Sequence, residues 1–296
     1  MHIEPTSRCT LACPACPRTW FGEKFHRAFP KIDLVVDDLS RFLDCESGQT
    51  VDHFLLNGNH GDPIYYPNLL DFIDHFRSTK YFKISTNGSF QKPEFWHALA
   101  EKLDSRDTVY FSIDGLEHNN HLYRRNSDWN SIMQGLEIMT KSSVKVVWKT
   151  LIFSYNQKEL DQIQALAQQH GAKFVSETTH RFGEASLAPD IKLIDTNRLY
   201  ETNVETTTLD PQCNKQEYIS ADGYYWPCCL ISTMFTLHKT ELWKQRHLWS
   251  IKNHNLDQLR SRLQEWQQAI IDKPAQAHIV CKMNCKPGQE FAWAKM

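Results

Sequence analysis

Short runs of β-branched and aromatic residues alternate along the chain with longer segments whose apolar residues recur every three or four positions. The short runs predict strands, and several of them end in Gly or Asn-Gly, which are typical of turns. These predicted strands are residues 1–6, 53–58, 81–88, 109–115, 144–153 and 172–179. The segments between them have the period of amphipathic helices, so most of the chain is predicted to repeat strand and helix.

Each predicted helix has an apolar face that a sheet can bury. The residues on these faces are Val35, Leu39 and Phe42; Leu69, Leu70, Ile73 and Phe76; Trp96, Leu99 and Leu103; Ile132, Leu136 and Met139; and Leu160, Ile163 and Ala167. Six strand–helix steps within the first 180 residues predict an α/β fold with a parallel sheet and right-handed crossovers. We expect a partial (β/α)6 TIM-like barrel, and an open doubly wound sheet has the same pattern. In both architectures the chemistry lies at the carboxyl ends of the strands.

The pattern changes after about residue 185, where a polar and weakly periodic segment is typical of a connector. The segment "EYISADGYYWPCC" then predicts a hairpin that turns at Asp222-Gly223, because Asp-Gly provides the positive φ angles of a tight turn. The amphipathic helix that follows has one apolar face, formed by Leu256, Leu259, Leu263, Trp266 and Ile270. We therefore predict two domains, a barrel over residues 1–185 and a small hairpin-plus-helix domain over residues 186–296.

Charge and hydropathy exclude several classes of partner. The 296 residues include 33 Lys and Arg against 35 Asp and Glu, for a formal net charge of -2. Such a balance provides no global basic field to recruit nucleic acid or an anionic membrane. No apolar run approaches the length of a membrane span, and the N-terminus lacks the layout of a signal peptide. We expect a soluble cytoplasmic protein that has no membrane partner.

The cysteines carry the strongest chemical signal. They form one group at Cys9, Cys13 and Cys16, a second at Cys213, Cys228, Cys229, Cys281 and Cys285, and a lone Cys45 that we expect to be an ordinary helix residue. An odd number of cysteines in a reducing compartment favours metal ligation over disulfides. Three thiolates on one loop suit a cubane iron–sulfur cluster, which takes one thiolate per iron and would keep one iron open. A zinc site with a distant fourth ligand, or unligated thiols, fits the spacing too.

Landmarks on later strands extend this pattern. The cysteines have the spacing C-x3-C-x2-C directly after the first strand, the second strand ends "NGNHGDP", the third "ISTNG", and the fourth "FSIDG" followed by "HNNHLYRR". This order resembles the radical S-adenosylmethionine superfamily from residue 3 to about residue 180. The resemblance implies that Cys9, Cys13 and Cys16 hold a [4Fe-4S] cluster whose fourth iron binds S-adenosylmethionine. It also implies reductive cleavage to a 5'-deoxyadenosyl radical, with a reductase such as flavodoxin or ferredoxin as electron donor.

The same resemblance implies contacts to the cofactor. Gly61, Asp62 and Pro63 would meet the methionine ammonium group through backbone or carboxylate atoms, and Arg124 or Arg125 would pair with the methionine carboxylate. Polar residues at the ends of the third and fourth predicted strands suit the ribose hydroxyls or the methionine carboxylate, namely Ser85, Asn87, Ser112 and Asp114. Each of these residues also fits a turn or a solvated helix end.

One position departs from the family pattern. The residue before the third motif cysteine is often aromatic in the family and packs near the adenine, whereas here it is Ala15. We expect another side chain to fill that volume, with Trp20 and Phe21 as candidates, or the adenine to lie differently.

The second cysteine group resembles the SPASM and twitch extensions of the same superfamily, because nine residues separate Cys213 from Gly223 and four separate Gly223 from Cys228. The resemblance implies one auxiliary [4Fe-4S] cluster, for which Cys213, Cys228, Cys281 and Cys285 supply four thiolates. Cys229 is a reserve ligand or a small buried residue. A four-cysteine zinc site is the alternative.

The resemblance implies hydrogen abstraction from a peptide or a small polar metabolite, in an oxidation or maturation reaction. Lys149, Glu177 and His180, together with Arg181, lie near the ends of the fifth and sixth strands and are candidates to face the substrate or accept a proton. Two alternatives stay open, which are radical modification of a nucleoside or nucleic acid and a non-catalytic zinc or iron–sulfur protein. Because the motif begins at residue 9, we expect no N-terminal peptide-recognition domain, and the ending "GQEFAWAKM" lacks the Gly-Gly of the molybdenum-cofactor cyclase.

Overall fold

The computed structural model describes residues 1–20, 24–25, 31–179, 184–190, 208–211, 213, 217–232, 240–285 and 287. The chain divides into two compact units. We call residues 3–33 with 52–196 the sheet unit, and residues 1–2 with 34–51 and 197–296 the hairpin unit. The domain boundary expected near residue 185 stays a prediction.

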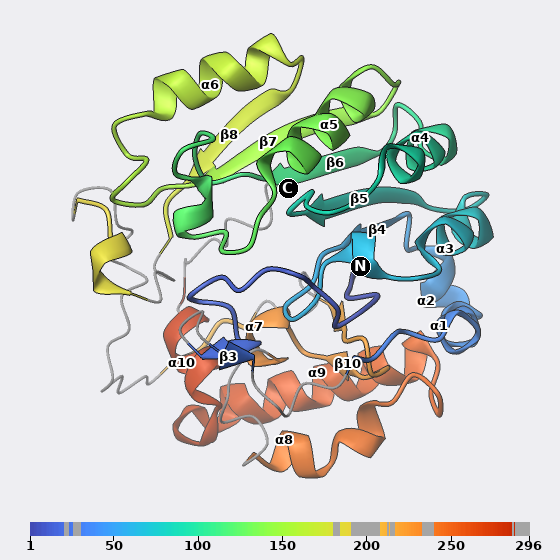
Figure 1. The fold of residues 1–296 in the computed structure, drawn as a ribbon. Coiled ribbons are helices and arrows are strands. Elements are labelled where there is room, and N and C mark those ends of the chain that lie inside the picture. Colours follow the sequence, from blue (N-terminus) through green and yellow to red (C-terminus); the bar gives the residue numbers. More distant parts are fainter. Residues whose placement is uncertain are drawn as a thin grey trace. The chain divides into compact units, whose positions relative to one another are not determined.

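The sheet unit is built on strands in the order β1-β4-β5-β6-β7-β8, of which β1 belongs to this unit through Ile3 (Figure 1). Their bounds are β1 (His2–Ile3), β4 (His53–Leu56), β5 (Tyr81–Thr86), β6 (Thr108–Ser112), β7 (Lys145–Leu151) and β8 (Lys173–Glu177). Each pair from β4–β5 to β7–β8 is parallel, and Asn57 N donates to Ile3 O over 3.2 Å beside β4. Five of these strands lie within the runs that the sequence predicts, and β6 begins one residue before its run, at Thr108, so the predicted α/β class is confirmed.

Helices form the connections between these strands, and Figure 1 shows them following one another along the same side of the sheet. They are α3 (Leu69–Phe76), α4 (Pro93–Lys102), α5 (Trp129–Thr140) and α6 (Leu160–Gln169). Shorter elements in this unit are β2 (Thr19–Trp20) paired with β3 (Lys24–Phe25), and the 3-10 turns η1 (Pro63–Tyr65), η2 (Asn120–Leu122) and η3 (Ala185–Leu187). The helices pack closely, because a Cβ atom on Gly135 would come within 2.4 Å of the Trp96 ring.

The two faces of the sheet differ in chemistry. Side chains alternate across a strand and register partners share a face. One face is apolar and inaccessible to solvent, with Phe54, Phe82, Phe111 and Trp148 each 0% exposed. The opposite face also carries buried residues such as Val147, but it holds six half-buried polar side chains that we call the polar face, namely Lys83, Ser85, Tyr110, Ser112, Lys149 and Glu177.

The hairpin unit contains the predicted hairpin, formed by β9 (Tyr218–Ile219) and β10 (Tyr225–Trp226) in antiparallel register. Gly223 has the positive φ angle of 79° that the turn requires, and its N–H donates to Ser220 O over 2.9 Å. The hairpin prediction is therefore confirmed. The helical elements of this unit are α1 (Val36–Leu43), α2 (Glu46–Gln49), α7 (Cys229–Ser232), α8 (Glu241–Lys244), η8 (Arg246–Trp249), α9 (Leu256–Asp272), η9 (Pro274–Gln276) and α10 (Ile279–Asn284).

Helix α9 buries Leu256, Leu259, Leu263 and Ile270, which is the face that the sequence predicts, with Trp266 half-buried. An ion pair fixes the helix to the hairpin, because Arg260 Nε and Nη2 donate to the two carboxylate oxygens of Glu217 over 2.6 and 2.9 Å. Two expectations need correction: Val35 is the exposed N-cap of α1 and not part of its buried face, and Cys45 is the N-cap of α2 and not a helix residue.

Most of the predicted polar connector lies outside the described residues. Within the part of the chain that the structure describes, no helix is both long and apolar enough to cross a bilayer.

Candidate functional site

The cysteine motif lies on the loop after β1, and backbone hydrogen bonds give this loop its shape. Cys16 N donates to Cys13 O over 3.0 Å, and Thr19 Oγ1 donates to the same Cys13 carbonyl over 2.8 Å. Cys13 is 8% exposed, while Cys9 and Cys16 are half-buried. The three thiols pack in one apolar cluster whose other members are Leu11, Ala15, Tyr123, Leu151, Phe153, Tyr155 and Leu187.

Burial makes the thiols of Cys9 and Cys13 hard to ionise. It raises the pKa of Cys9 to about 12, and the carboxylate of Asp62 adds to this rise. Burial likewise raises the pKa of Cys13 to about 12, although Arg124 beside it acts in the opposite direction. A metal centre removes this cost, because a coordinated thiol is deprotonated and its charge is offset by the cations. The donor set therefore fits a group that supplies positive charge to the loop.

Among the described residues, no three His, Cys, Asp or Glu side chains form a group that could bind a single metal ion. A cluster of several irons does not require such a group. In a cubane cluster, by contrast, each thiolate binds a different iron.

A buried ion pair lies next to Cys13. Asp114, two residues after β6, is 0% exposed, and its Oδ2 accepts from Arg124 Nε over 2.6 Å. Its Oδ1 accepts from Leu151 N over 2.7 Å, which joins the ends of β6 and β7. Burial alone would lower the pKa of Arg124, yet it is raised, because Asp114 and Cys13 lie beside the guanidinium. Arg125 instead pairs with Glu184, over 2.5 Å.

The loop after β4 lies directly against the motif loop. A Cβ atom on Gly61 would come within 1.8 Å of Thr6 O, so only glycine allows this approach. Asp62 N donates to Arg8 O, next to Cys9, over 2.8 Å. The Asp62 carboxylate is 6% exposed and accepts from Ile64 N at the start of η1, where Pro63 is the first residue, and from Asn87 N after β5.

Glu4 is a site residue that the sequence patterns do not reveal. It is 1% exposed, and its Oε1 accepts from His60 N over 2.6 Å and from Gly61 N over 2.8 Å. The carboxylate therefore holds the loop that approaches the cysteines. One signal in the sequence could have indicated Glu4: it is an acidic residue within the first predicted strand, and a buried charge needs partners.

The predicted contacts at the ends of β5 and β6 divide into two groups. Ser85 and Ser112 lie half-buried on the polar face. Asn87 and Asp114 are buried and make hydrogen bonds within the chain. Their contacts to a cofactor stay predictions.

The polar face holds an ion pair near its carboxyl end, in which Lys149 Nζ lies 2.9 Å from Glu177 Oε2. Burial, together with the nearby Glu177, raises the pKa of Tyr110. Two predicted catalytic residues thus lie together, and Tyr110 is a neighbour that the sequence patterns did not indicate. His180 and Arg181 lie outside the described residues.

Three aromatic rings share the apolar cluster of the motif cysteines with Ala15. The Phe153 ring stacks on Tyr123 at 4.2 Å between centroids and on Tyr155 at 5.6 Å. Ala15 and Tyr155 both pack against this cluster. Among the described residues, the buried Tyr155 hydroxyl has no hydrogen-bond partner. These three rings, which we call the aromatic wall, therefore give the cluster a flat apolar side and one polar atom that makes no hydrogen bond within the described residues.

The second cysteine group lies in the hairpin unit. Cys229 and Cys281 belong to its apolar core, and Cys228 and Cys285 pack against that core. The buried Cys213 is close enough to Cys285 and Cys228 for the charges to interact, and burial raises the pKa of Cys213 to about 12. The four predicted ligands are therefore neighbours, and Cys229 is buried at the start of α7.

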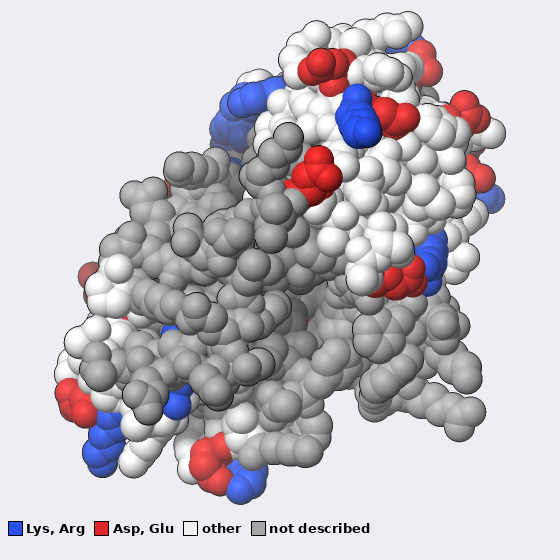
Figure 2. Space-filling model, turned by 90° about the vertical axis from the view of Figure 1, so that its left-hand side faces the viewer, with Lys and Arg blue, Asp and Glu red and all other residues white. Residues whose placement is uncertain are grey.

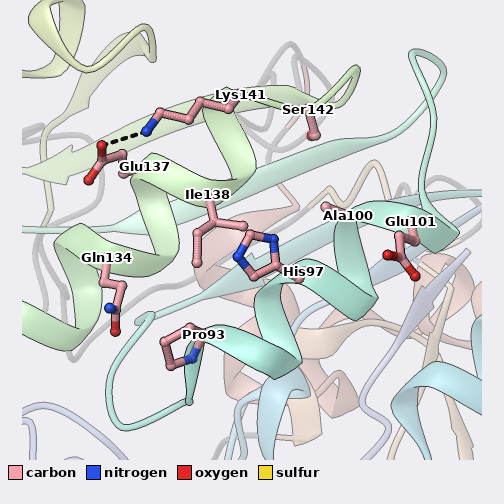
Figure 3. A pocket seen from close by; sticks show the side chains of 9 residues that line it. All are labelled: Pro93, His97, Ala100, Glu101, Gln134, Glu137, Ile138, Lys141 and Ser142. Carbon is pink, nitrogen blue, oxygen red and sulfur yellow. Dashed lines mark hydrogen bonds and ion pairs between the residues drawn. The ribbon is translucent and has the colours of Figure 1, made fainter.

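Other surfaces offer less chemistry. A groove of about 560 Å3 lies between α4 and α5, where Figure 3 shows Lys141 paired with Glu137, and no predicted site residue lines it. On the face in Figure 2, the described acidic and basic side chains are interspersed, and neither sign gathers into a patch.

Comparison with known proteins identifies the class. The model of the radical SAM superfamily matches residues 3–169, which is more than half of the chain. The chain belongs to the radical SAM superfamily, whose members use a [4Fe-4S] cluster and S-adenosylmethionine. No curated protein gives a significant match.

Solved structures agree on the fold. Native anSMEcpe with bound AdoMet is 15% identical, with a TM-score of 0.61 over 96% of this chain and 88% of that one. The same protein with AdoMet and the Cp18Cys peptide is 16% identical, with a TM-score of 0.59 over 88% and 79%. Streptococcus suis SuiB bound to S-adenosylmethionine has a TM-score of 0.47 at 13% identity, over 84% and 64%. The likeness to anSMEcpe supports the partial TIM-like barrel over the open doubly wound sheet.

The aromatic wall generates a first prediction. Tyr155→Ala should weaken S-adenosylmethionine binding to the reconstituted protein about tenfold, because stacking of a base on an aromatic ring contributes roughly 1–3 kcal/mol. Equilibrium dialysis measures the affinity, and Tyr155→Phe separates the ring from the hydroxyl. Tyr81→Ala is the matched control, because Tyr81 also stacks on a ring, that of His53. It is the first residue of β5 and so lies away from the carboxyl ends of the strands. Equal affinities in wild type and Tyr155→Ala would show that the wall does not contact the cofactor.

Proposed function

We propose that this radical SAM protein is an enzyme that abstracts a hydrogen atom from a peptide or a small polar metabolite, in an oxidation or maturation reaction. The observation that carries the proposal is that Cys9, Cys13 and Cys16 pack in one apolar cluster on the loop after β1, with Arg124 beside Cys13. Neither a fully ligated electron carrier nor a zinc module would need polar side chains at the strand ends next to these thiols.

Cys9, Cys13 and Cys16 would hold three irons of a [4Fe-4S] cluster. When bound, the cluster and S-adenosylmethionine supply a 5'-deoxyadenosyl radical after reduction, for which we propose flavodoxin or ferredoxin as donor. The chain's part is to orient the cofactor and exclude water. The apolar cluster around the thiols and the ion pair between Asp114 and Arg124 serve these purposes.

Different groups of residues would orient the cofactor. Gly61, Asp62 and Pro63 present backbone atoms to the methionine ammonium, while the guanidinium of Arg124 attracts its carboxylate. Ser85 and Ser112 offer hydroxyls on the polar face that would suit the ribose. The wall of Tyr123, Phe153 and Tyr155 occupies the side of Ala15, and we propose that it takes the place of the missing aromatic residue next to the adenine.

The polar face is the proposed substrate surface. Lys149 and Glu177 form an ion pair with both side chains only partly exposed, at 14% and 31%. Such a pair can bind amide or carboxylate groups of a substrate, and Glu177 can accept a proton from a product radical. The peptide in the anSMEcpe structure gives peptides additional support as the substrate class. Among the described residues on the face in Figure 2, acidic and basic side chains are interspersed and form no basic patch for a nucleic acid.

We also propose one auxiliary [4Fe-4S] cluster held by Cys213, Cys228, Cys281 and Cys285. Cys228, Cys281 and Cys285 pack in one core and Cys213 lies close enough to Cys285 for their charges to interact, which supports the proposal, since four thiolates saturate one cubane.

The central activity has a direct assay. Anaerobic reconstitution with iron and sulfide, followed by dithionite and S-adenosylmethionine, should yield 5'-deoxyadenosine in chromatography. Cys13→Ala should abolish it, because the cluster loses a ligand, whereas Cys45→Ala should not, since Cys45 belongs to neither cysteine group. A fully loaded wild type that neither forms 5'-deoxyadenosine nor binds S-adenosylmethionine would refute the proposal.

The auxiliary cluster predicts metal content. Anaerobically purified protein should contain about eight iron and eight sulfide per chain, two cubanes. Cys285→Ala should lower both to about four, while Cys229→Ala should leave them unchanged. About one zinc with only one cubane's worth of iron would favour the zinc site instead.

The proposed roles of Glu177 and His180 toward the substrate can be tested with any substrate that the wild-type protein converts. Glu177→Gln, and separately His180→Ala, should lower product formation about a hundredfold, the usual contribution of an acid–base group. Formation of 5'-deoxyadenosine should persist, because neither residue belongs to the cysteine loop. Glu101→Gln, on the exposed side of α4, is the matched control. Full turnover in both variants would remove these residues from the mechanism.

A further inference from the structure

A side-chain amide lies against one motif thiol. Asn87 Nδ2 donates to Cys9 Sγ over 3.6 Å, within the range of a hydrogen bond to sulfur. The backbone N–H of Leu11 donates to the same sulfur over 3.5 Å. Asn87 is 4% exposed, so water does not compete for this contact.

The surroundings fix the orientation of the amide. Asn87 Nδ2 also donates to Asp62 Oδ2 over 2.5 Å, and Asn87 Oδ1 accepts from Ser89 N over 2.9 Å. A flipped amide would place an oxygen against the Asp62 carboxylate and an N–H group against the Ser89 N–H. The flipped amide would therefore lose both hydrogen bonds, so the N–H groups of Asn87 must face Asp62 and Cys9.

Asp62 is itself held in place. Its Oδ2 accepts from Asn87 N over 2.7 Å, and its Oδ1 accepts from Ile64 N over 3.2 Å. Thr86 also hydrogen-bonds to this carboxylate. The ends of β4 and β5 are thereby joined through one buried acid, which presents the amide to the thiol.

We propose that Asn87 is a positioning residue that tunes the reduction potential of the cluster bound at Cys9, and that Asp62 holds its amide against the sulfur. The inference rests on the proposed function, because it requires a cluster at Cys9. Hydrogen bonds to cluster sulfurs are among the factors that set the potential. A donor stabilises the reduced cluster more than the oxidised one, because the sulfur carries more negative charge after reduction. Asn87 therefore makes the cluster easier to reduce.

The test is a redox titration followed by electron paramagnetic resonance, reading the signal that changes when S-adenosylmethionine is added. Asn87→Ala should shift the midpoint potential to more negative values. Thr86→Val is the matched control, because it removes a hydrogen bond to Asp62 without touching a thiol, and its potential should equal that of wild type. An unchanged potential in Asn87→Ala would overturn the inference while leaving the proposed function intact. A wild type that binds no [4Fe-4S] cluster would overturn both.

Wild-type protein gives a second readout if Asn87→Ala does not fold. With 15N placed in asparagine side chains, pulsed resonance of the reduced cluster should detect a coupled nitrogen. The absence of that coupling in a loaded wild type would contradict the hydrogen bond and hence the inference.

Discussion

Cys13 is buried and Cys9 is half-buried at the carboxyl edge of the sheet, and burial raises the pKa of both thiols, so they ionise readily only where positive charge offsets that cost. Arg124 supplies part of that charge beside Cys13, but Asp114 pairs with it at 2.6 Å and takes up much of its effect. A cationic cluster would supply the rest. The surrounding structure holds the loop ready for such a group, since glycine at position 61 allows the close approach to Thr6 O.

Two buried carboxylates hold neighbouring segments together near the motif cysteines. Asp62 joins the ends of β4 and β5, and Asp114 joins the ends of β6 and β7. Each sits on the inner side of a loop that follows a strand, where backbone N–H groups have no partner in the sheet. The apolar face of the sheet packs under helices, and its polar face keeps half-buried groups such as Lys149 and Glu177 at the same edge. Binding chemistry and packing are thus separated by the two-residue period of the strands.

The sequence predicts local features well and distant pairings poorly. Strand periodicity and the Asp-Gly turn locate β4 to β8 and the hairpin, because both signals lie within a few residues. The spacing of Cys9, Cys13 and Cys16 indicates their chemistry for the same reason. The partners of Glu4 and Asn87 lie 56 and 25 residues away in the chain, and no pattern reveals such pairs. The packing of Tyr155 and Ala15 against the same cluster depends on the course of the loop after β7, which sequence periodicity does not describe.

The central claim is that Cys9, Cys13 and Cys16 hold a cluster with one iron open to S-adenosylmethionine. Electron–nuclear double resonance tests it most directly, on the reduced, reconstituted protein with S-adenosylmethionine carrying 15N in its amino group. We predict a nitrogen coupling that shows direct binding of the methionine group to the cluster and that disappears in Cys13→Ala. A loaded cluster whose spectrum does not change when S-adenosylmethionine is added would contradict the claim.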